Sequence, residues 1–341
     1  MNIDSLLEKN LLPDCVIRMG IRRLLKKRLK EEKKSSPDEQ QNHFNKLLEV
    51  CRNSPIAIET KAANEQHYEV PTEFYNYCLG PNLKYSSGFY KDGVTELEQA
   101  EKEMLAITCE RAELKDGMEI LELGCGWGSL TLWMGKHFPN AKIIAVSNSK
   151  TQKEFIDATA KDRGLNNIEI ITADMNVFST EKKFDRIVSV EMFEHMRNHG
   201  KLLKNISSWL KEDGALFVHI FTHKELLYFF EVKDNSDWMS NHFFTGGMMP
   251  SDHLLYYWNE DLKVKKHWRV SGIHYAKTSE AWLKNMDKNK SAILPLFEKT
   301  YGKENTTKWW VYWRVFFLAC AELWKFKNGE EWFVSHYLLK K

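Results

Sequence analysis

The sequence predicts a doubly wound α/β fold with a seven-stranded sheet, and two observations support this prediction. From about residue 100 onward, short apolar runs alternate with helical segments, a pattern typical of right-handed crossovers between parallel strands. The first apolar run ends in the glycine-rich sequence GCGWGS, a turn that nucleotide-binding α/β folds place after their first strand. The length of 341 residues is sufficient for one enlarged α/β domain.

Seven short apolar runs are expected to form the strands of this sheet. They span residues 118–123, 142–147, 168–173, 186–190, 215–221, 264–271 and 332–339. Helical periodicity predicts helices between the earlier strands, at residues 130–137, 151–162 and 201–211.

The chain divides into an N-terminal helical extension, residues 1–64, and a second domain, residues 65–341, that contains the predicted sheet. Two aromatic-rich stretches, at about 222–260 and 275–326, are expected to be helical insertions that cap the active site. Residues 31–41 have the composition of a linker, with two serines followed by a proline.

The N-terminal extension contains a basic amphipathic helix. Ile17, Ile21, Leu24 and Leu25 recur at helical spacing among many Lys and Arg residues. One interpretation is a surface helix that docks on the core through its apolar stripe. The other is peripheral contact with an anionic membrane surface. Most surface helices have one face like this, which favours the first interpretation.

Composition excludes several classes of function. The chain is 43% hydrophobic and 28% charged, as globular proteins are, and its formal net charge of +2 predicts no nucleic-acid partner. Its six cysteines form no CxxC pair and have no His at zinc-ligand spacing, so no metal site is expected. Scattered single cysteines indicate reduced thiols and a cytoplasmic location. No apolar run approaches the length of a transmembrane helix, and Asp4 and Glu8 stand where an export signal would be basic and then apolar.

The sequence ELGCGWGS at residues 122–129 is the expected cofactor turn. Gly124, Gly126 and Gly128 permit a tight turn and a close approach of a ligand to the backbone. Nicotinamide enzymes use a similar turn, so the glycines alone do not decide the cofactor. The GxGxG spacing, in place of GxGxxG, and the acid Glu122 before the first glycine favour S-adenosyl-L-methionine over a dinucleotide.

The ends of the next two predicted strands supply further candidate cofactor contacts. Ser147, Asn148 and Gln152 offer hydroxyl and amide groups to a ribose diol, where many nucleotide-binding folds have an acid. Asp174 can accept a hydrogen bond from the adenine amino group, and Met175 can pack on the ring. The alternative role for Asp174 is a helix cap that follows the strand.

Several sequence blocks resemble one family of methyltransferases over nearly all of the chain from about residue 60. The blocks are GCGWG, SVEMFEHM, VPTEFY, YSSGFY, FTGGMMPS, NGEEW and, near the N-terminus, LLPDCVIRMGIRRLL. They resemble the cyclopropane-fatty-acyl-phospholipid synthase family, and most closely its coclaurine N-methyltransferase-like branch. The resemblance implies a Rossmann-like class I methyltransferase fold and an S-adenosylmethionine-dependent transferase of EC class 2.1.1.

The resemblance also assigns roles to individual residues. Gly124, Gly126 and Asp174 match cofactor contacts, and Ser147 and Gln152 match the family's second-strand loop. Tyr85 and Ser86 match a segment that closes over the methionine end of the cofactor.

Other matched positions concern the reacting groups. Glu194, His219 and Cys125 match residues that bind a bicarbonate base in the cyclopropane synthases. Phe317 aligns with a tyrosine of those enzymes, and this departure argues against lipid cyclopropanation. Glu191, Glu194 and His195 match the active-site groups of the N-methyltransferase branch.

The residues themselves support this assignment. Glu191, Glu194 and His195 follow the fourth predicted strand, at the sheet edge where such folds bind ligands. If they lie on a helix, their spacing of three and four places them on one side. A carboxylate or imidazole there can hold an ammonium and then take its proton. The alternative interpretation is a solvent-exposed turn whose charged side chains have no role in catalysis.

Aromatic residues are dense near the C-terminus, between Trp309 and Phe333. Core packing accounts for part of this density, and as a group the rings can line a pocket for a flat aromatic amine, a cation or an acyl chain. His219 and Phe317 are the candidate pocket residues.

Three functions remain open on these grounds. The first is N-methylation of a small amine, and the second is modification of unsaturated acyl chains on a membrane. The third is cofactor binding without catalysis, against which the intact Glu and His cluster argues. A homodimer is an alternative to a monomer that the sequence does not decide.

Overall fold

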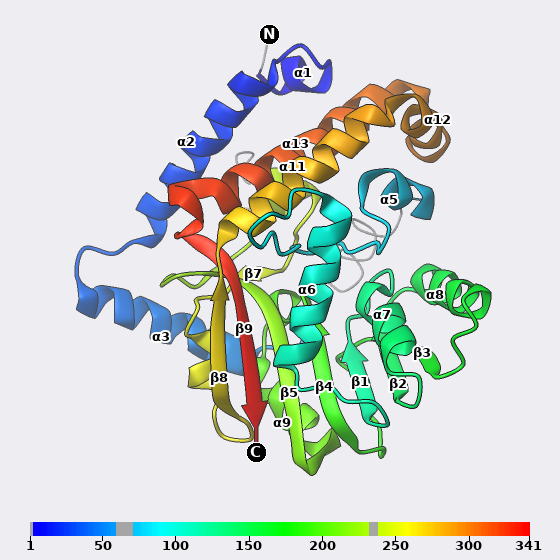
Figure 1. Ribbon diagram of the computed structural model, residues 1–341. Helices are drawn as coiled ribbons and strands as arrows, with labels where there is room; N and C mark the ends of the chain where they lie inside the picture. The colour runs from blue at the N-terminus through cyan, green and yellow to red at the C-terminus, as the bar shows by residue number, and fades with distance from the viewer. Residues whose placement is uncertain (1–2, 59–70, 232–237) are drawn as a thin grey trace.

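The computed structural model describes residues 3–58, 71–231 and 238–341. A seven-stranded sheet forms the centre of the molecule, with the strand order β3-β2-β1-β4-β5-β9-β8 (Figure 1). Strands β1 to β5 run parallel, and β9 runs antiparallel to both β5 and β8. The strands are β1 (Glu119–Leu123), β2 (Lys142–Ser147), β3 (Ile168–Thr172), β4 (Phe184–Val190), β5 (Leu210–His223), β8 (Lys263–Val270) and β9 (Trp332–Lys340). The predicted seven-stranded α/β fold is therefore confirmed.

Alternate residues of the central strands face two different helical layers. Ile120 and Ile143 pack in one cluster with residues of α6 and α7. Their neighbours Leu121 and Ile144 pack in a second cluster with residues of α3 and α9. Helices therefore cover both faces of the sheet, as a doubly wound fold requires. The helices involved are α3 (Pro37–Asn53), α6 (Leu97–Arg111), α7 (Ser129–His137), α8 (Lys150–Asp162) and α9 (His199–Trp209).

Three long helices lie above the carboxyl edge of the parallel strands (Figure 1). They are α11 (Gly272–Lys288), α12 (Lys290–Tyr301) and α13 (Thr306–Lys325), and they match the helices expected at about 275–326. Two short 3₁₀ turns, η3 (Lys303–Asn305) and η4 (Phe326–Gly329), flank α13.

The stretch at about 222–260 is not the helical insertion that the sequence suggested. Its described part holds a small antiparallel sheet of β6 (Tyr228–Phe229) and β7 (Met248–Met249), with the short α10 (Trp238–His242) and η2 (Leu254–Tyr257). The sequence GGMMP at residues 246–250 explains the difference, because Gly246 takes a positive φ of 77° and proline cannot continue a helix.

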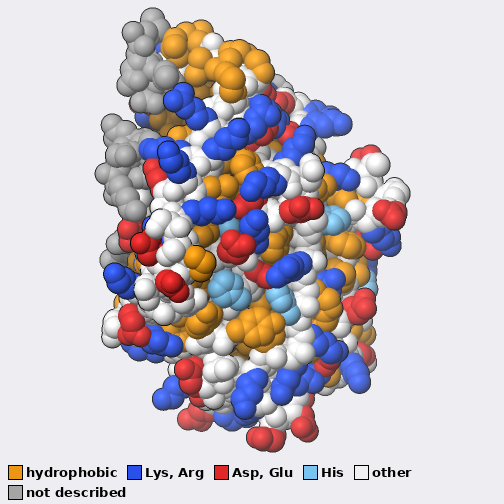
Figure 2. All heavy atoms as spheres, turned by 90° about the vertical axis from the view of Figure 1, so that its left-hand side faces the viewer, with side chains coloured by type: hydrophobic (Ala, Val, Ile, Leu, Met, Phe, Trp, Pro, Cys, Tyr) orange, Lys and Arg blue, Asp and Glu red, His pale blue; other side chains and the backbone are white. Residues whose placement is uncertain are grey.

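The N-terminal helices pack against the helical cap. They are α1 (Ile3–Glu8) and α2 (Asp14–Glu32), and the short α5 (Thr72–Cys78) follows farther along the chain. Arg18 of α2 donates to Glu280 of α11 at 2.6 Å and to Glu322 of α13 at 3.0 Å. Ile21 is buried, whereas Leu24 of the predicted stripe is 45% exposed. Figure 2 shows the Lys and Arg side chains of this face interspersed with hydrophobic ones.

The linker predicted at residues 31–41 is shorter in the structure. Only residues 33–36 separate α2 from α3, because Ser36 accepts a hydrogen bond from the Glu39 N–H and Pro37 begins the helix. Serine as the cap and proline at the first position are favourable at a helix start, so these residues begin a helix where composition suggested a linker. No helix in the described ranges is long and apolar enough to span a bilayer.

Candidate active site

A cavity lies at the carboxyl edge of the sheet, where β1, β2, β3 and β4 end beneath α11 and α13. Twelve of the residues predicted to bind cofactor or to act in catalysis border it. They are Tyr85, Ser86, Gly124, Gly126, Ser147, Asn148, Gln152, Asp174, Met175, Glu191, Glu194 and His195. Parallel pairing explains this convergence, because the strand ends stand in register: Leu123 faces Val146 on one side and Ser189 on the other.

The two glycines of the β1 turn differ in what they do. A Cβ added at Gly124 would lie 2.7 Å from the side chain of Met192, so packing requires glycine there. A Cβ at Gly126 would meet no atom within 4 Å, and Gly126 borders the cavity with a φ of +52°. Open space above a backbone in this conformation suits a ligand that passes over the turn.

Glu122, at the end of the same strand, also borders the cavity. It is 2% exposed and accepts a hydrogen bond of 2.5 Å from the Thr131 hydroxyl. Burial raises the pKa of Glu122 to about 8. A cationic group that entered the cavity beside Glu122 would favour its ionised form.

The side chains after β2 and β3 are held in place by local hydrogen bonds. The Ser147 hydroxyl donates to the Gln152 side-chain oxygen at 2.7 Å, and the Ser149 N–H donates to the Ser147 hydroxyl at 3.0 Å. Asp174 accepts from the Asn176 N–H at 2.8 Å, so it stabilises a turn after β3 and does not cap a helix there. Asp174 also borders the cavity, so this turn is compatible with a role in cofactor binding.

The segment that contains Tyr85 and Ser86 is anchored by a buried acid. Glu101 of α6 accepts from the backbone N–H groups of Gly80 at 3.1 Å and Asn82 at 3.0 Å. The next residues then reach the cavity, and the Tyr85 ring lies 5.2 Å from Tyr75. Lys84 of this segment borders the cavity as well. The sequence did not indicate Lys84 as a site residue, because a lysine beside a tyrosine has no motif of its own.

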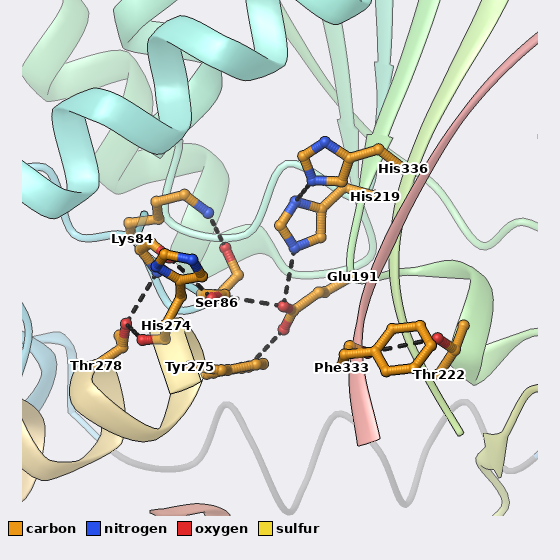
Figure 3. Close-up of polar contacts among 12 residues, drawn as sticks. Lys84, Ser86, Glu191, His219, Thr222, His274, Tyr275, Thr278, Phe333 and His336 are labelled. Carbon is orange, nitrogen blue, oxygen red and sulfur yellow. Dashed lines mark hydrogen bonds and ion pairs between the residues drawn. The ribbon is translucent and has the colours of Figure 1, made fainter. Parts of the chain in front are cut away.

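Glu191 stands at the centre of a hydrogen-bond network (Figure 3). One carboxylate oxygen accepts from the His219 ring at 3.2 Å and from the Ser87 N–H at 3.3 Å, and the other accepts from the Tyr275 hydroxyl at 2.6 Å. Glu191 has a φ of +47°, a conformation that non-glycine residues rarely adopt. Burial raises the pKa of Glu191 to about 7. The three donors fix this carboxyl group in one orientation.

The network continues behind His219. His219 Nδ1 lies 2.9 Å from His336 Nε2, and His336 Nδ1 lies 2.9 Å from an Arg111 guanidinium nitrogen. A guanidinium only donates, so His336 Nδ1 accepts and His336 Nε2–H donates to His219 Nδ1. The proton of His219 is thereby placed on Nε2, which faces Glu191. Burial keeps the pKa of both rings well below the ordinary histidine value, so both are neutral.

Glu194 contrasts with Glu191. It is 1% exposed and borders the cavity, and its Oε2 has no hydrogen-bond partner within the described residues. Burial, and next the charge of Glu191, raise the pKa of Glu194 well above its ordinary value. The ring of His195 lies 4.6 Å from that of Phe244. Glu194 and His195 belong to a short 3₁₀ turn, η1 (Phe193–His195), so the α-helical spacing assumed for them is wrong, although all three side chains border one cavity.

Two predictions about the pocket require correction. Phe317 does not border the cavity; it is 1% exposed and packs against Trp282 and Trp313 in the core. Because successive helix residues turn by about 100°, the face of α13 toward the cavity instead presents Phe316 and Cys320. His219 is also absent from the described cavity wall, and it contacts that wall through its hydrogen bond to Glu191.

The structure brings together two of the three residues matched to a bicarbonate site. Cys125 borders the same cavity as Glu194 and packs in one cluster with Leu132 and Ile156, whereas His219 is absent from the cavity wall. A tyrosine hydroxyl is nevertheless present at the site, because Tyr275 of α11 donates to Glu191 at 2.6 Å. No pattern in the sequence joined Tyr275 to Glu191, which lies 84 residues away in the chain.

The remainder of the cavity wall is largely apolar. Its aromatic and methionine residues come from β5, the β6–β7 region, α11 and α13: Phe221, Phe230, Met239, Phe244, Met249, Tyr275, Trp282, Phe316 and Trp324. Such a wall excludes water from the groups at the sheet edge and fits flat or apolar ligands.

Comparisons with known proteins show the family to which the chain belongs. The family model for mycolic acid cyclopropane synthetase matches residues 57–330. An (S)-coclaurine N-methyltransferase from Thalictrum flavum subsp. glaucum is 40% identical over 339 residues, which cover 98% of this chain and 94% of that protein. A cyclopropane-fatty-acyl-phospholipid synthase from Escherichia coli strain K12 is 28% identical over 248 residues, which cover 71% of this chain and 62% of that protein.

A crystal structure of a coclaurine N-methyltransferase, bound to N-methylheliamine and S-adenosylhomocysteine, superposes with a TM-score of 0.96. The two chains are 39% identical, and the match covers 99% of each. Sequence, fold and the geometry of the β1 turn thus lead to one conclusion: the chain belongs to the mycolic acid cyclopropane synthetase family and is an S-adenosylmethionine-dependent methyltransferase.

Proposed function

We propose that this protein transfers the methyl group of S-adenosylmethionine to the nitrogen of a small aromatic amine. The observation that carries the proposal is the buried Glu194 carboxyl, which borders an aromatic cavity and has an oxygen without a partner in the described chain. A buried polar oxygen without a partner is unfavourable, and an amine N–H would satisfy it. The likeness to coclaurine N-methyltransferases supports an amine of the alkaloid type.

Each active-site group has a distinct part in this reaction. When bound, S-adenosylmethionine supplies a methyl group already activated by its sulfonium. The nitrogen lone pair forms the new N–C bond as the C–S bond breaks, so the amine must be neutral. Glu194 holds the amine N–H and takes its proton, with His195 at the same wall of the cavity.

Glu191 serves in this scheme as a carboxyl group held in one orientation, and it is negatively charged above its pKa of about 7. Its three donors restrain it, and its repulsion of Glu194 helps to raise the pKa of Glu194, which makes Glu194 the better proton acceptor. The aromatic wall aligns the amine with the methyl donor and excludes water.

A second candidate function is modification of unsaturated acyl chains. The apolar wall could hold an acyl chain, and the similarity to the Escherichia coli synthase favours this candidate. Against it, the His219 and Tyr275 donors are already occupied by Glu191. The two functions separate when the purified protein is incubated with labelled S-adenosylmethionine and either an amine panel or phospholipid vesicles. Label in an amine supports the proposal, and label confined to the lipid fraction overturns it.

We also propose an organisation for the chain. Residues 1–64 serve as an extension of a methyltransferase domain, 65–341, in which residues of about 222–260 and 275–326 cap the site. Six free thiols support a cytoplasmic location.

Two exposed apolar side chains are candidates for contact with a second copy of the chain or with a lipid surface. They are Leu11 and Met19, both at least 60% exposed. Sedimentation equilibrium tests for self-association, and co-sedimentation with vesicles tests for lipid binding.

A further inference from the structure

Lys84 is a buried cation that the methyl-transfer scheme does not use. It is 3% exposed, and it is the one Lys or Arg among the described residues that border the cavity. Its ammonium donates to the Ser86 hydroxyl, a neutral acceptor (Figure 3). An ammonium carries three N–H donors, and a buried charge is normally paired with an opposite charge. The position therefore lacks an anionic partner.

The carboxylates nearest to Lys84 are each bound to other groups. Glu101 accepts from the Gly80 and Asn82 backbone, Glu122 accepts from Thr131, and Glu191 accepts from its three donors. All three favour the charged form of Lys84 electrostatically, whereas burial lowers its pKa to about 8. None of them forms an ion pair with Lys84 within the described residues.

The cavity offers groups of opposite charge for a zwitterion. Glu122 stands at the end of β1, beside the open backbone of Gly126, and Lys84 lies close enough to lower the pKa of Glu122. The methionine end of the cofactor carries one ammonium and one carboxylate. An acid and a base that border the same part of the cavity are complementary to these two groups.

We propose that the Lys84 ammonium, together with the Ser86 hydroxyl, binds the α-carboxylate of S-adenosylmethionine. The ammonium and the hydroxyl already contact each other, so one carboxylate can accept from both without a rearrangement of the segment. Glu101 holds the turn that precedes Lys84, which presets this arrangement before the cofactor binds. The site thus recognises the amino-acid part of the cofactor through charge, in addition to the adenosine part through the ends of β2 and β3.

The test compares two ligands that differ only in the carboxylate: S-adenosylhomocysteine and decarboxylated S-adenosylhomocysteine. Calorimetry on the wild type should show that loss of the carboxylate weakens binding by about 10- to 100-fold, the range for a charged hydrogen bond. Lys84→Met should weaken S-adenosylhomocysteine by a similar factor and leave the decarboxylated ligand nearly unchanged. Lys102→Met, which removes an exposed lysine of α6, is the matched control and should alter neither affinity.

Lys84→Gln is the second variant, because its amide can keep a hydrogen bond to Ser86 without the charge. It should lose the discrimination between the two ligands as the Met variant does, and circular dichroism of the empty protein checks that each variant is folded. An equal loss of affinity for both ligands would assign Lys84 to the structure of the segment. Unchanged affinity for both ligands, with a lower rate of methyl transfer, would mean that Lys84 acts on Glu191 and not on the cofactor carboxylate. Either result overturns the proposal.

Discussion

At the scale of single residues, similar side chains in this site have different physical roles. Gly124 and Gly126 both have positive φ, but only Gly124 is enclosed by a neighbouring side chain. Glu191 and Glu194 both follow β4 and border the cavity, but only Glu191 is held by three donors within the described residues. The sequence motifs identified all four residues and could not distinguish these roles, because the distinction depends on contacts with distant segments such as α11.

Gly126→Asp is expected to abolish cofactor binding. Its carboxylate would enter the open space above the β1 turn and repel the carboxylate of the cofactor. Gly117→Asp is the matched control, since Gly117 also has a positive φ and open surroundings but does not border the cavity. Calorimetry with S-adenosylhomocysteine measures the difference, and unchanged affinity in folded Gly126→Asp would remove this turn from the cofactor site.

Glu194→Ala is expected to lower turnover by about 10²–10⁴, the usual contribution of a general acid or base, with little effect on cofactor affinity. The reason is that Glu194 has an oxygen without a partner in the described chain, so its removal breaks few internal contacts. Steady-state kinetics and cofactor calorimetry on one preparation give both quantities. Equal losses in the two would mean that Glu194 supports the fold or the cofactor instead.

At the scale of elements, strands and their order followed from the sequence, whereas register and helix orientation did not. His219 and His336 lie in predicted strands, yet only the antiparallel pairing of β5 with β9 places them opposite each other. Helix α13 is apolar around most of its circumference between Trp309 and Trp324, so no stripe indicated that Phe317 faces the core. Tertiary packing decides both features.

The pairing of β5 with β9 makes His336 a positioning residue for Glu191. In His336→Leu, His219 Nδ1 loses its donor, and the ring can place its proton on Nδ1 instead of on Nε2. We expect turnover to fall by about 10-fold, with unchanged cofactor affinity, since a hydrogen bond to a charged group contributes about 1.5–3 kcal/mol. ¹⁵N NMR of the His219 ring should show the proton on Nε2 in the wild type and a mixture in the variant. His336→Gln, which can still donate, should restore the wild-type tautomer; an unchanged His219 signal in His336→Leu would contradict this role.

At the scale of the whole molecule, the sequence predicted some of the parts that form the site better than others. The sheet and its carboxyl edge were predictable, because apolar runs and glycine turns are local signals. The cap was predictable only in part, since the β6–β7 region depends on a pairing between residues about 20 positions apart. The N-terminal helices reinforce the cap through ion pairs such as Arg18–Glu280 and Arg314–Asp14, which no local pattern indicates.

The groups that line the cavity predict how amine methylation depends on bicarbonate and on pH. Because the His219 and Tyr275 donors already bind Glu191, the site needs no added anion to occupy them. Activity on a secondary amine should therefore persist in bicarbonate-depleted buffer. Its rate should rise as the pH approaches the pKa of the amine, because only the neutral amine attacks. Glu194 changes the rate in the same direction. Because its pKa is raised, its carboxyl becomes protonated as the pH falls and can no longer accept a proton, so the rate falls as well.

Mass spectrometry of the products decides between the amine and the acyl chain. A methylated amine formed at the same rate with and without bicarbonate would agree with Glu191 as the internal carboxylate of the site. Methylene-bridged acyl chains from vesicles, with no methylated amine from a broad panel, would contradict it. In that case the Glu194 oxygen that has no partner among the described residues would accept a proton from carbon rather than from nitrogen, because the same buried carboxyl borders the cavity for either acceptor.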